Sequence, residues 1–111
     1  MKFSYEDHDA VTVLTLSGEF NTDQADGFRR KCQDRFRAGI RDIVLDVTHL
    51  ELIDSAGLEL FMWLQDEAAT NLGQLRLVQP GETIRKILEI TRLDKRFDVH
   101  DSIESAARSL R

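Results

Sequence analysis

A regular alternation of strand-like and helix-like segments is the feature of this sequence that most constrains its fold. Four short runs are rich in β-branched and leucine side chains and have strand length: residues 11–17, 43–47, 75–78 and 97–99. After each run, apolar side chains recur at three- and four-residue spacing, which predicts an amphipathic helix. A chain that alternates in this way forms right-handed crossovers and a mainly parallel sheet. The sequence therefore predicts an α/β fold.

Capping residues and glycines give the expected boundaries. The strand at 11–17 is expected to end at Gly18, and residues 2–6 are expected to add a short antiparallel edge strand. The four helices are expected from Asn21 or Thr22 to about Gly39, from Asp54 or Ser55 to about Asn71, over a segment with Ile84, Ile87 and Leu88 on one face, and from Ser102 to Leu110. We thus expect one domain over residues 1–111, with a four- to five-stranded, mostly parallel sheet and four helices.

The composition is that of an ordinary globular domain. Of the 111 residues, 41% are hydrophobic and 32% are charged, which is enough apolar surface for one core. The formal net charge is −5, so neither nucleic acid nor an anionic membrane is expected as the main partner. Cys32 is the only cysteine, so no intrachain disulfide is possible. No apolar run suits a secretion signal or membrane insertion, and we expect a cytoplasmic protein.

Charge is distributed unevenly along the chain. Residues 42–75 contain seven acidic residues and neither lysine nor arginine, whereas residues 29–41 contain six basic residues. The basic residues fall mostly on the outer faces of the first predicted helix. The acidic segment includes the start of the second predicted helix, so a partner that binds there meets negative charge.

Patterns typical of catalysis and metal binding are missing. The sequence contains no G-x-S-x-G, no G-x-x-x-x-G-K-[ST] and no G-x-G-x-x-G, so it predicts neither a hydrolase nucleophile nor a phosphate-binding loop. The three histidines, His8, His49 and His100, are far apart and lack the i, i+4 spacing of a helical metal site. We therefore expect no catalytic residue, no metal, no cofactor and no enzymatic activity.

The most unusual segment runs from Leu52 to Leu58, where a hydrophobic strand ends and the second helix begins. In open α/β sheets, ligands and partners meet the carboxyl ends of the strands, where such junctions lie. One interpretation is that Asp54 or Ser55 is only a helix N-cap, a role worth about 1 kcal/mol. Gly57 in the first turn costs up to about 1 kcal/mol relative to alanine, which suggests that something approaches the backbone closely. An exposed hydroxyl at a helix start, beside an aspartate, is also suited to a phosphorylation switch.

Two large apolar residues of the second helix lie away from its predicted inner face. That inner face comprises Leu58, Phe61, Met62, Ala68, Ala69 and Leu72. Leu60 and Trp63 lie on the opposite side, beside Glu59 and Glu67. Two interpretations remain open: a neighbouring helix or the helix's own packing covers them, or they form an apolar patch with an acidic rim that suits a protein partner.

Four segments, in order and at normal spacing, resemble the STAS domain, the family of anti-sigma factor antagonists. Residues 13–21 (VLTLSGEFN) are similar to the family's strand that ends in Gly-Glu-Leu-Asp. Residues 43–58, which end in IDSAGL, resemble the family's next strand and its signature Asp-Ser-x-Gly-Leu. Residues 75–94 and 97–106 resemble the later strand and helix and the closing segment. The resemblance covers essentially the whole chain and implies a single STAS-type domain.

The resemblance also implies a function and a site. In this family the serine after the signature aspartate, here Ser55, is phosphorylated by a cognate anti-sigma factor that is also a serine kinase. The unphosphorylated form binds the anti-sigma factor and so frees the sigma factor for transcription; phosphorylation ends the binding, and a protein phosphatase resets the serine. The partner-binding residues expected around Ser55 are Asn21, Thr22, Asp54, Ala56, Gly57 and Leu58.

The sequence departs from the family pattern at two positions, and the resemblance also leaves two other functions open. Asn21 stands where the family usually has aspartate, and Glu59 where it usually has glycine. STAS-like domains also serve as accessory subunits of lipid-transport ABC systems, where the junction is a static contact. A third possibility is a scaffold subunit of a signalling assembly, in which Leu60 and Trp63 mediate weak self-association.

Overall fold

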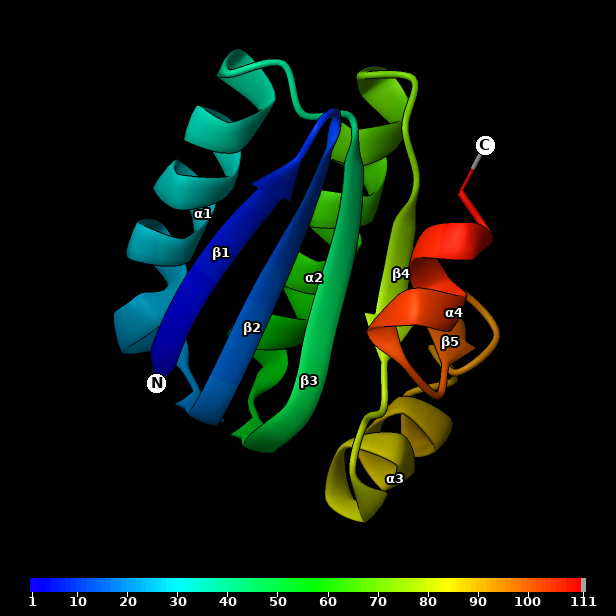
Figure 1. Cartoon of the computed structure of the whole chain (residues 1–111). Helices are drawn as coiled ribbons and strands as arrows, with labels where there is room; N and C mark the ends of the chain where they lie inside the picture. Colours follow the sequence, from blue (N-terminus) through cyan, green and yellow to red (C-terminus); the bar gives the residue numbers. More distant parts are fainter. Residues whose placement is uncertain (111) are drawn as a thin grey trace.

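The computed structural model of the protein describes residues 1–110, which form five strands and four helices (Figure 1). The strands are β1 (Lys2–His8), β2 (Val11–Phe20), β3 (Asp42–Ile53), β4 (Leu75–Val78) and β5 (Asp98–His100). The helices are α1 (Thr22–Arg37), α2 (Ser55–Thr70), α3 (Glu82–Ile90) and α4 (Ile103–Arg108). The α/β alternation predicted from the sequence is confirmed, and the helices start within one or two residues of the predicted caps.

The five strands form one sheet in the order β1-β2-β3-β4-β5. β1 pairs antiparallel with β2, and the remaining pairs, β2 with β3, β3 with β4 and β4 with β5, are parallel. The predicted edge strand is therefore present and extends to His8. Because consecutive strands are neighbours and parallel, the carboxyl ends of β2 and β3 lie side by side at one edge of the sheet.

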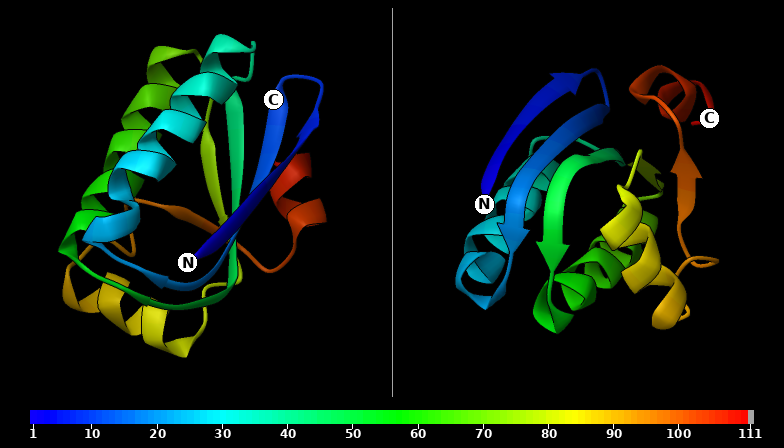
Figure 2. Two further views of the ribbon diagram at one scale, coloured as in Figure 1. Left: turned by 90° about the vertical axis from the view of Figure 1, so that its left-hand side faces the viewer. Right: turned by 90° about the horizontal axis from the view of Figure 1, so that it is seen from below.

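Helices cover the sheet unequally on its two faces (Figure 2). α1 and α2 lie together against one face, α4 lies against the other, and α3 lies beyond the carboxyl end of β4. This arrangement leaves the starts of α1 and α2 together at the same end of the molecule. The junction singled out in the sequence therefore lies at the edge of the sheet, next to the start of another helix.

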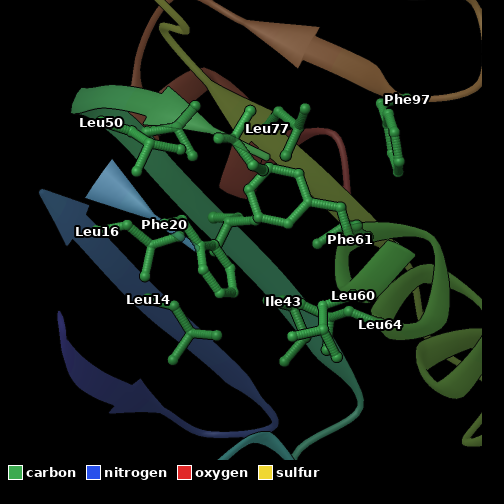
Figure 3. Close-up of a cluster of buried hydrophobic side chains, with 14 of the residues drawn as sticks. Leu14, Leu16, Phe20, Ile43, Leu50, Leu60, Phe61, Leu64, Leu77 and Phe97 are labelled. Atoms are coloured by element: carbon green, nitrogen blue, oxygen red, sulfur yellow. The ribbon is translucent and has the colours of Figure 1, made fainter. Parts of the chain in front are cut away.

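The main core fills the space between the sheet and the α1–α2 layer. Alternate residues of the central strands, such as Leu14, Leu16 and Leu45, are completely buried there. Aromatic rings join the two layers: the ring centroid of Phe20 lies 4.9 Å from that of Phe28 and 5.9 Å from that of Phe61. Figure 3 shows Phe20 and Phe61 within the core. A smaller cluster on the other face consists of Val44, Val78 and Ala106 of α4.

The predicted end of β2 at Gly18 is wrong. The strand continues through Gly18, which adopts φ 85°, and its pairing with β3 shifts register between Gly18 and Glu19. Gly18 pairs with Leu50 and Glu19 with Leu52, so the extra residue lies on β3 and β2 is not interrupted. Glycine adopts the positive φ without a Cβ penalty. Phe20, just past the bulge, is 1% exposed and reaches the core.

The predicted faces of α2 also need correction. Leu60 is 2% exposed and belongs to the main core, whereas Leu72, predicted to point inward, is 86% exposed. Trp63 is half-buried, and the Arg29 guanidinium of α1 lies 4.8 Å from its ring centroid. Because α1 packs beside α2, the buried arc of α2 is wider than a single stripe. The interpretation that Leu60 is covered within the protein is therefore correct, and Leu60 cannot contribute to a self-association surface.

Ala69 of α2, which was predicted to face inward, lies at the surface, and in α4 the apolar residues Ile103 and Ala107 are also exposed. α4 has six residues and packs on the face of the sheet formed by β3, β4 and β5, and Ala106 is its one fully buried side chain among the described residues. A helix of less than two turns directs few residues toward the sheet, so its remaining apolar side chains lie at the surface.

The Leu60→Ala substitution is expected to lower the free energy of unfolding by about 2–5 kcal/mol, because it removes buried methyl groups and leaves a cavity. Leu72→Ala makes the same truncation at a residue that is 86% exposed, and it should change the free energy by less than about 0.5 kcal/mol. Urea unfolding followed by circular dichroism measures both. Equal losses in the two variants would contradict the burial of Leu60 and the exposure of Leu72 described above.

Candidate functional site

The candidate site is the place where β2 and β3 end and both lead directly into helices. Phe20 and Ile53, the last residues of the two strands, are paired partners. The Asp54 N–H then donates to the Phe20 carbonyl oxygen at 3.1 Å, which extends the strand pairing by one more residue. The first residues of α1 and α2 are therefore held next to each other, although they are more than thirty residues apart in the chain.

The Asp54 carboxylate binds the start of both helices. Its Oδ1 accepts a hydrogen bond from the Gly57 N–H at 3.0 Å, which makes Asp54 the N-cap of α2. Its Oδ2 accepts from the Thr22 N–H at 3.1 Å and from the Thr22 hydroxyl at 3.4 Å, and Thr22 is the first residue of α1. One side chain thus ties the two strand-to-helix junctions together.

These hydrogen bonds favour the ionised form of Asp54. The Gly57 N–H, and after it the N–H and hydroxyl of Thr22, hold the pKa of the Asp54 carboxyl below its ordinary value of 3.8. The positive end of the α2 dipole acts in the same direction. The site therefore carries a fixed negative charge at neutral pH, next to Ser55.

Asn21 caps α1 in a separate hydrogen-bonded unit. Its Oδ1 accepts from the Asp23 N–H at 2.9 Å, and its own N–H donates to the Gln24 side-chain oxygen at 3.1 Å. This is a capping box, and the spacing of Asn21 and Gln24 is the sequence signal that identifies it. The sequence left Asn21 and Thr22 as alternative caps; the cap is Asn21, and Thr22 instead meets Asp54.

Ser55 is the first residue of α2 and is exposed. Its hydroxyl has no hydrogen-bond partner within residues 1–110, because Asp54 caps the helix in its place. The alternative in which Ser55 is the N-cap is therefore wrong. The hydroxyl stands free at a helix start, where the backbone dipole and unpaired N–H groups tolerate added negative charge.

Gly57 and Leu58 are buried, which changes how they contribute to the site. A Cβ on Gly57 would lie 2.6 Å from Cγ1 of Ile53 and 3.3 Å from the Phe20 ring. The close approach that the sequence indicated at Gly57 is thus made by the protein's own core. Leu58 is 7% exposed and also packs in the core, so partner contact through either residue stays a prediction.

Acidic and apolar side chains surround Ser55 at the surface. The exposed acidic residues of the adjoining segments are Glu19, Asp23, Glu51 and Glu59. Leu52, three residues before Ser55, is 46% exposed. Thr22 is exposed, and Asn21, Asp54 and Ala56 are half-buried. The accessible part of the predicted site is therefore a serine within an acidic surface, without a neighbouring lysine or arginine in residues 42–75.

Groups that could support catalysis are dispersed in the described part of the chain. No three histidine, cysteine, aspartate or glutamate side chains of residues 1–110 are arranged to hold a metal ion. His8 pairs with Glu6 at 3.0 Å, and His100 lies 3.0 Å from the Ser105 hydroxyl on the far side of the sheet. Burial raises the pKa of the Cys32 thiol to about 12, so it is not a nucleophile at neutral pH.

The fold and the junction together define a small α/β domain with an exposed serine at a helix start. The sequence matches the STAS domain over residues 2–106, and the chain belongs to this family. Within residues 1–110, every helix falls short of the length and apolarity needed to cross a bilayer.

Relatives of this chain are named as anti-sigma factor antagonists. A Thermotoga maritima protein provisionally given that name is 29% identical over 110 residues, which is 98% of this chain and 97% of that protein. The Bordetella bronchiseptica protein BtrV, provisionally named in the same way, is 28% identical and matches 96% of this chain and 92% of that protein.

Solved structures give the same fold. A crystal structure from Thermotoga maritima, of a protein with the same provisional name, superposes with a TM-score of 0.89 at 28% identity and covers 97% of this chain and 93% of that one. The anti-sigma factor antagonist SpoIIAA in its unphosphorylated form superposes with a TM-score of 0.84 at 22% identity over 97% and 96% of the two chains. At that identity the likeness to SpoIIAA supports the fold.

The charge of Asp54 gives the protein a predictable response to acid. Because the folded-state pKa is below 3.8, the stabilisation from the ionised carboxylate is fully present above that pH and is lost as the pH falls through the folded-state value. Asp54→Asn should melt at a lower temperature than the wild type at pH 7, and the gap should close on acidification below about pH 3.8. Thermal melts between pH 7 and pH 2 measure this difference in melting temperature.

Asp94→Asn is the matched control, because Asp94 is exposed and its carboxylate makes no hydrogen bond or ion pair within residues 1–110. Its melting temperature should follow that of the wild type at every pH. A constant gap between Asp54→Asn and wild type down to pH 2 would show that the ionised Asp54 does not contribute.

Proposed function

We propose that this protein is an anti-sigma factor antagonist that binds an anti-sigma factor while Ser55 is unphosphorylated. The anti-sigma factor is itself the serine kinase that phosphorylates Ser55, and phosphorylation releases it. The exposed, unpartnered Ser55 hydroxyl at the start of α2 is the observation on which the proposal rests. Membership of the STAS family and the names of the relatives support the same class of partner.

The surroundings of Ser55 explain why the modification would act on the partner and leave the fold intact. A phosphoserine adds about −1.5 to −2 charges and three strong acceptor oxygens. At a helix start such a group is tolerated, and the Ser55 side chain lies outside the core that Gly57 and Leu58 help to form. The added charge would join Asp54, Glu51 and Glu59, so a partner docked at this surface meets bulk and repulsion.

The chemistry of the switch is supplied by the partner. The Ser55 hydroxyl attacks the γ-phosphorus of ATP held by the kinase; the new O–P bond forms as the bond to ADP breaks, and the hydroxyl proton passes to the kinase's base. A protein phosphatase hydrolyses the phosphoserine and restores the binding form. Through this cycle the protein would control, in the cytoplasm, how much sigma factor is free for transcription.

Acidic substitutions of Ser55 should mimic the released state. Ser55→Asp and Ser55→Glu are expected to lose binding to the purified anti-sigma factor, whereas Ser55→Ala should bind it and resist phosphorylation. Ser4→Asp, an acidic substitution of an exposed serine on β1, is the matched control and should bind like the wild type. Titration calorimetry measures the affinities, and wild-type affinity in both acidic Ser55 variants would contradict the switch.

The modification itself can be detected directly. The wild type is incubated with ATP and each purified anti-sigma factor of the source organism, and the peptide that contains Ser55 is analysed by mass spectrometry. At least one of these proteins should add 80 Da, the mass of one HPO₃ group, to the peptide at Ser55, with none added in Ser55→Ala. Wild-type protein that neither binds nor is modified by any of them would overturn the proposed function.

A further inference from the structure

A row of exposed and half-buried side chains runs along α2 from Ser55. Residues three, four and seven apart share one face of a helix, so Ser55 is followed on its face by Glu59, Met62 and Trp63. Ser55 and Glu59 are exposed, and Met62 and Trp63 are half-buried. We call these four residues the outer α2 row. The sequence pattern assigned Met62 to the core, against which it does pack, and so it did not place Met62 or Trp63 on one surface with Ser55.

Trp63 is held in a fixed position within this row. The Arg29 guanidinium of α1 lies 4.8 Å from its ring centroid, in cation–π geometry, and the ring also packs on the main core. Tryptophan, methionine and arginine are enriched at the centres of protein interfaces, and a side chain that is already ordered loses little entropy on binding. The far end of the outer α2 row therefore has the properties of an interface anchor.

Glu59 contributes a negative charge that the protein itself does not neutralise. Its carboxylate has no ion-pair partner within residues 1–110, whereas Asp66, farther along the same helix, is paired with Arg96 at 3.1 Å. No lysine or arginine occurs between residues 42 and 75 to supply one locally. A cationic side chain from outside would therefore find an accessible, unpaired carboxylate about one helical turn from Ser55.

A typical protein–protein interface is large enough to cover the whole outer α2 row. Trp63 is eight residues from Ser55, so the row is about 12 Å long at a rise of 1.5 Å per residue. A stable protein–protein interface covers about 800 Å² on each partner, which corresponds to a disc roughly 30 Å across. A partner centred on Ser55 can therefore reach Trp63.

We propose that the partner that binds at Ser55 docks along the outer α2 row, placing a lysine or arginine against Glu59 and apolar side chains against Met62 and Trp63. This inference rests on the proposed function, because it takes the anti-sigma factor as the occupant. It assigns Glu59 and Trp63 as determinants of which anti-sigma factor is bound. The charge that Glu59 offers, unneutralised within the described chain, is the reason for a basic partner surface.

The test measures affinity for the anti-sigma factor that phosphorylates Ser55, with unphosphorylated protein throughout. Glu59→Lys and Trp63→Ala should each weaken binding about tenfold or more, and Met62→Ala should weaken it severalfold. The Glu59→Lys loss should shrink at high salt, since it arises from charge. Two controls match the substitutions away from the row: Glu104→Lys, an exposed charge reversal on α4, and Phe36→Ala, a half-buried aromatic truncation at the other end of α1.

The outcomes separate this inference from the function on which it rests. Thermal melts of all variants identify any loss of binding that arises from unfolding. The Phe36→Ala variant shows how much reduced stability alone weakens binding. Wild-type affinity in Glu59→Lys and Trp63→Ala would overturn the docking row while leaving the Ser55 switch intact. Weaker binding by Leu52→Asp, with the row variants unaffected, would place the contact on the opposite side of Ser55 and would likewise overturn it. Absence of any binding by the wild type would overturn both.

Discussion

The geometry of the site depends on the Asp54 carboxylate, which holds the first turns of two helices at once. Through Gly57 it caps α2, and through Thr22 it fixes the start of α1. The contact is possible because β2 and β3 end level with each other, at the pair Phe20 and Ile53. Everything proposed for Ser55 follows from this arrangement, since Asp54 takes over the capping role and leaves the neighbouring hydroxyl without a structural task.

Within the five residues from Asp54 to Leu58, the buried residues hold the structure together and Ser55 lies at the surface. Gly57 and Leu58 face Ile53, Phe20 and the core, while Ser55 faces outward. A charged group added at Ser55 therefore lies beside the helix start, where it is tolerated, and away from the packing that determines stability. This separation allows a modification to change binding while the fold stays the same, which is the property that a reversible switch needs.

Much of this fold could be predicted because its signals are local: strand runs, helical periodicity and caps gave the order of the elements and the junction at Asp54 and Ser55. The spacing of Asn21 and Gln24 also signals the capping box, although the prediction left Asn21 and Thr22 as alternative caps. The hydrogen bond between Asp54 and Thr22 could not be predicted, because it depends on a strand register that an extra residue of β3 shifts opposite Gly18 and Glu19. Leu60 was misplaced because the buried arc of a helix covered by both a sheet and a neighbouring helix is wider than periodicity alone indicates. Leu72 was misplaced because α2 ends at Thr70, and Leu72 lies beyond the C-cap Asn71 with φ 64°, where helical periodicity no longer applies.

The most direct test of the central claim compares one protein in two chemical states. Wild-type protein fully phosphorylated at Ser55, and the same protein treated with a phosphatase, are titrated into the cognate anti-sigma factor in a calorimeter. Binding at least about a hundredfold weaker in the phosphorylated form, a difference of about 2.7 kcal/mol, with an unchanged melting curve, is the predicted result. Equal affinities in the two states, or a loss of binding accompanied by unfolding, would contradict it.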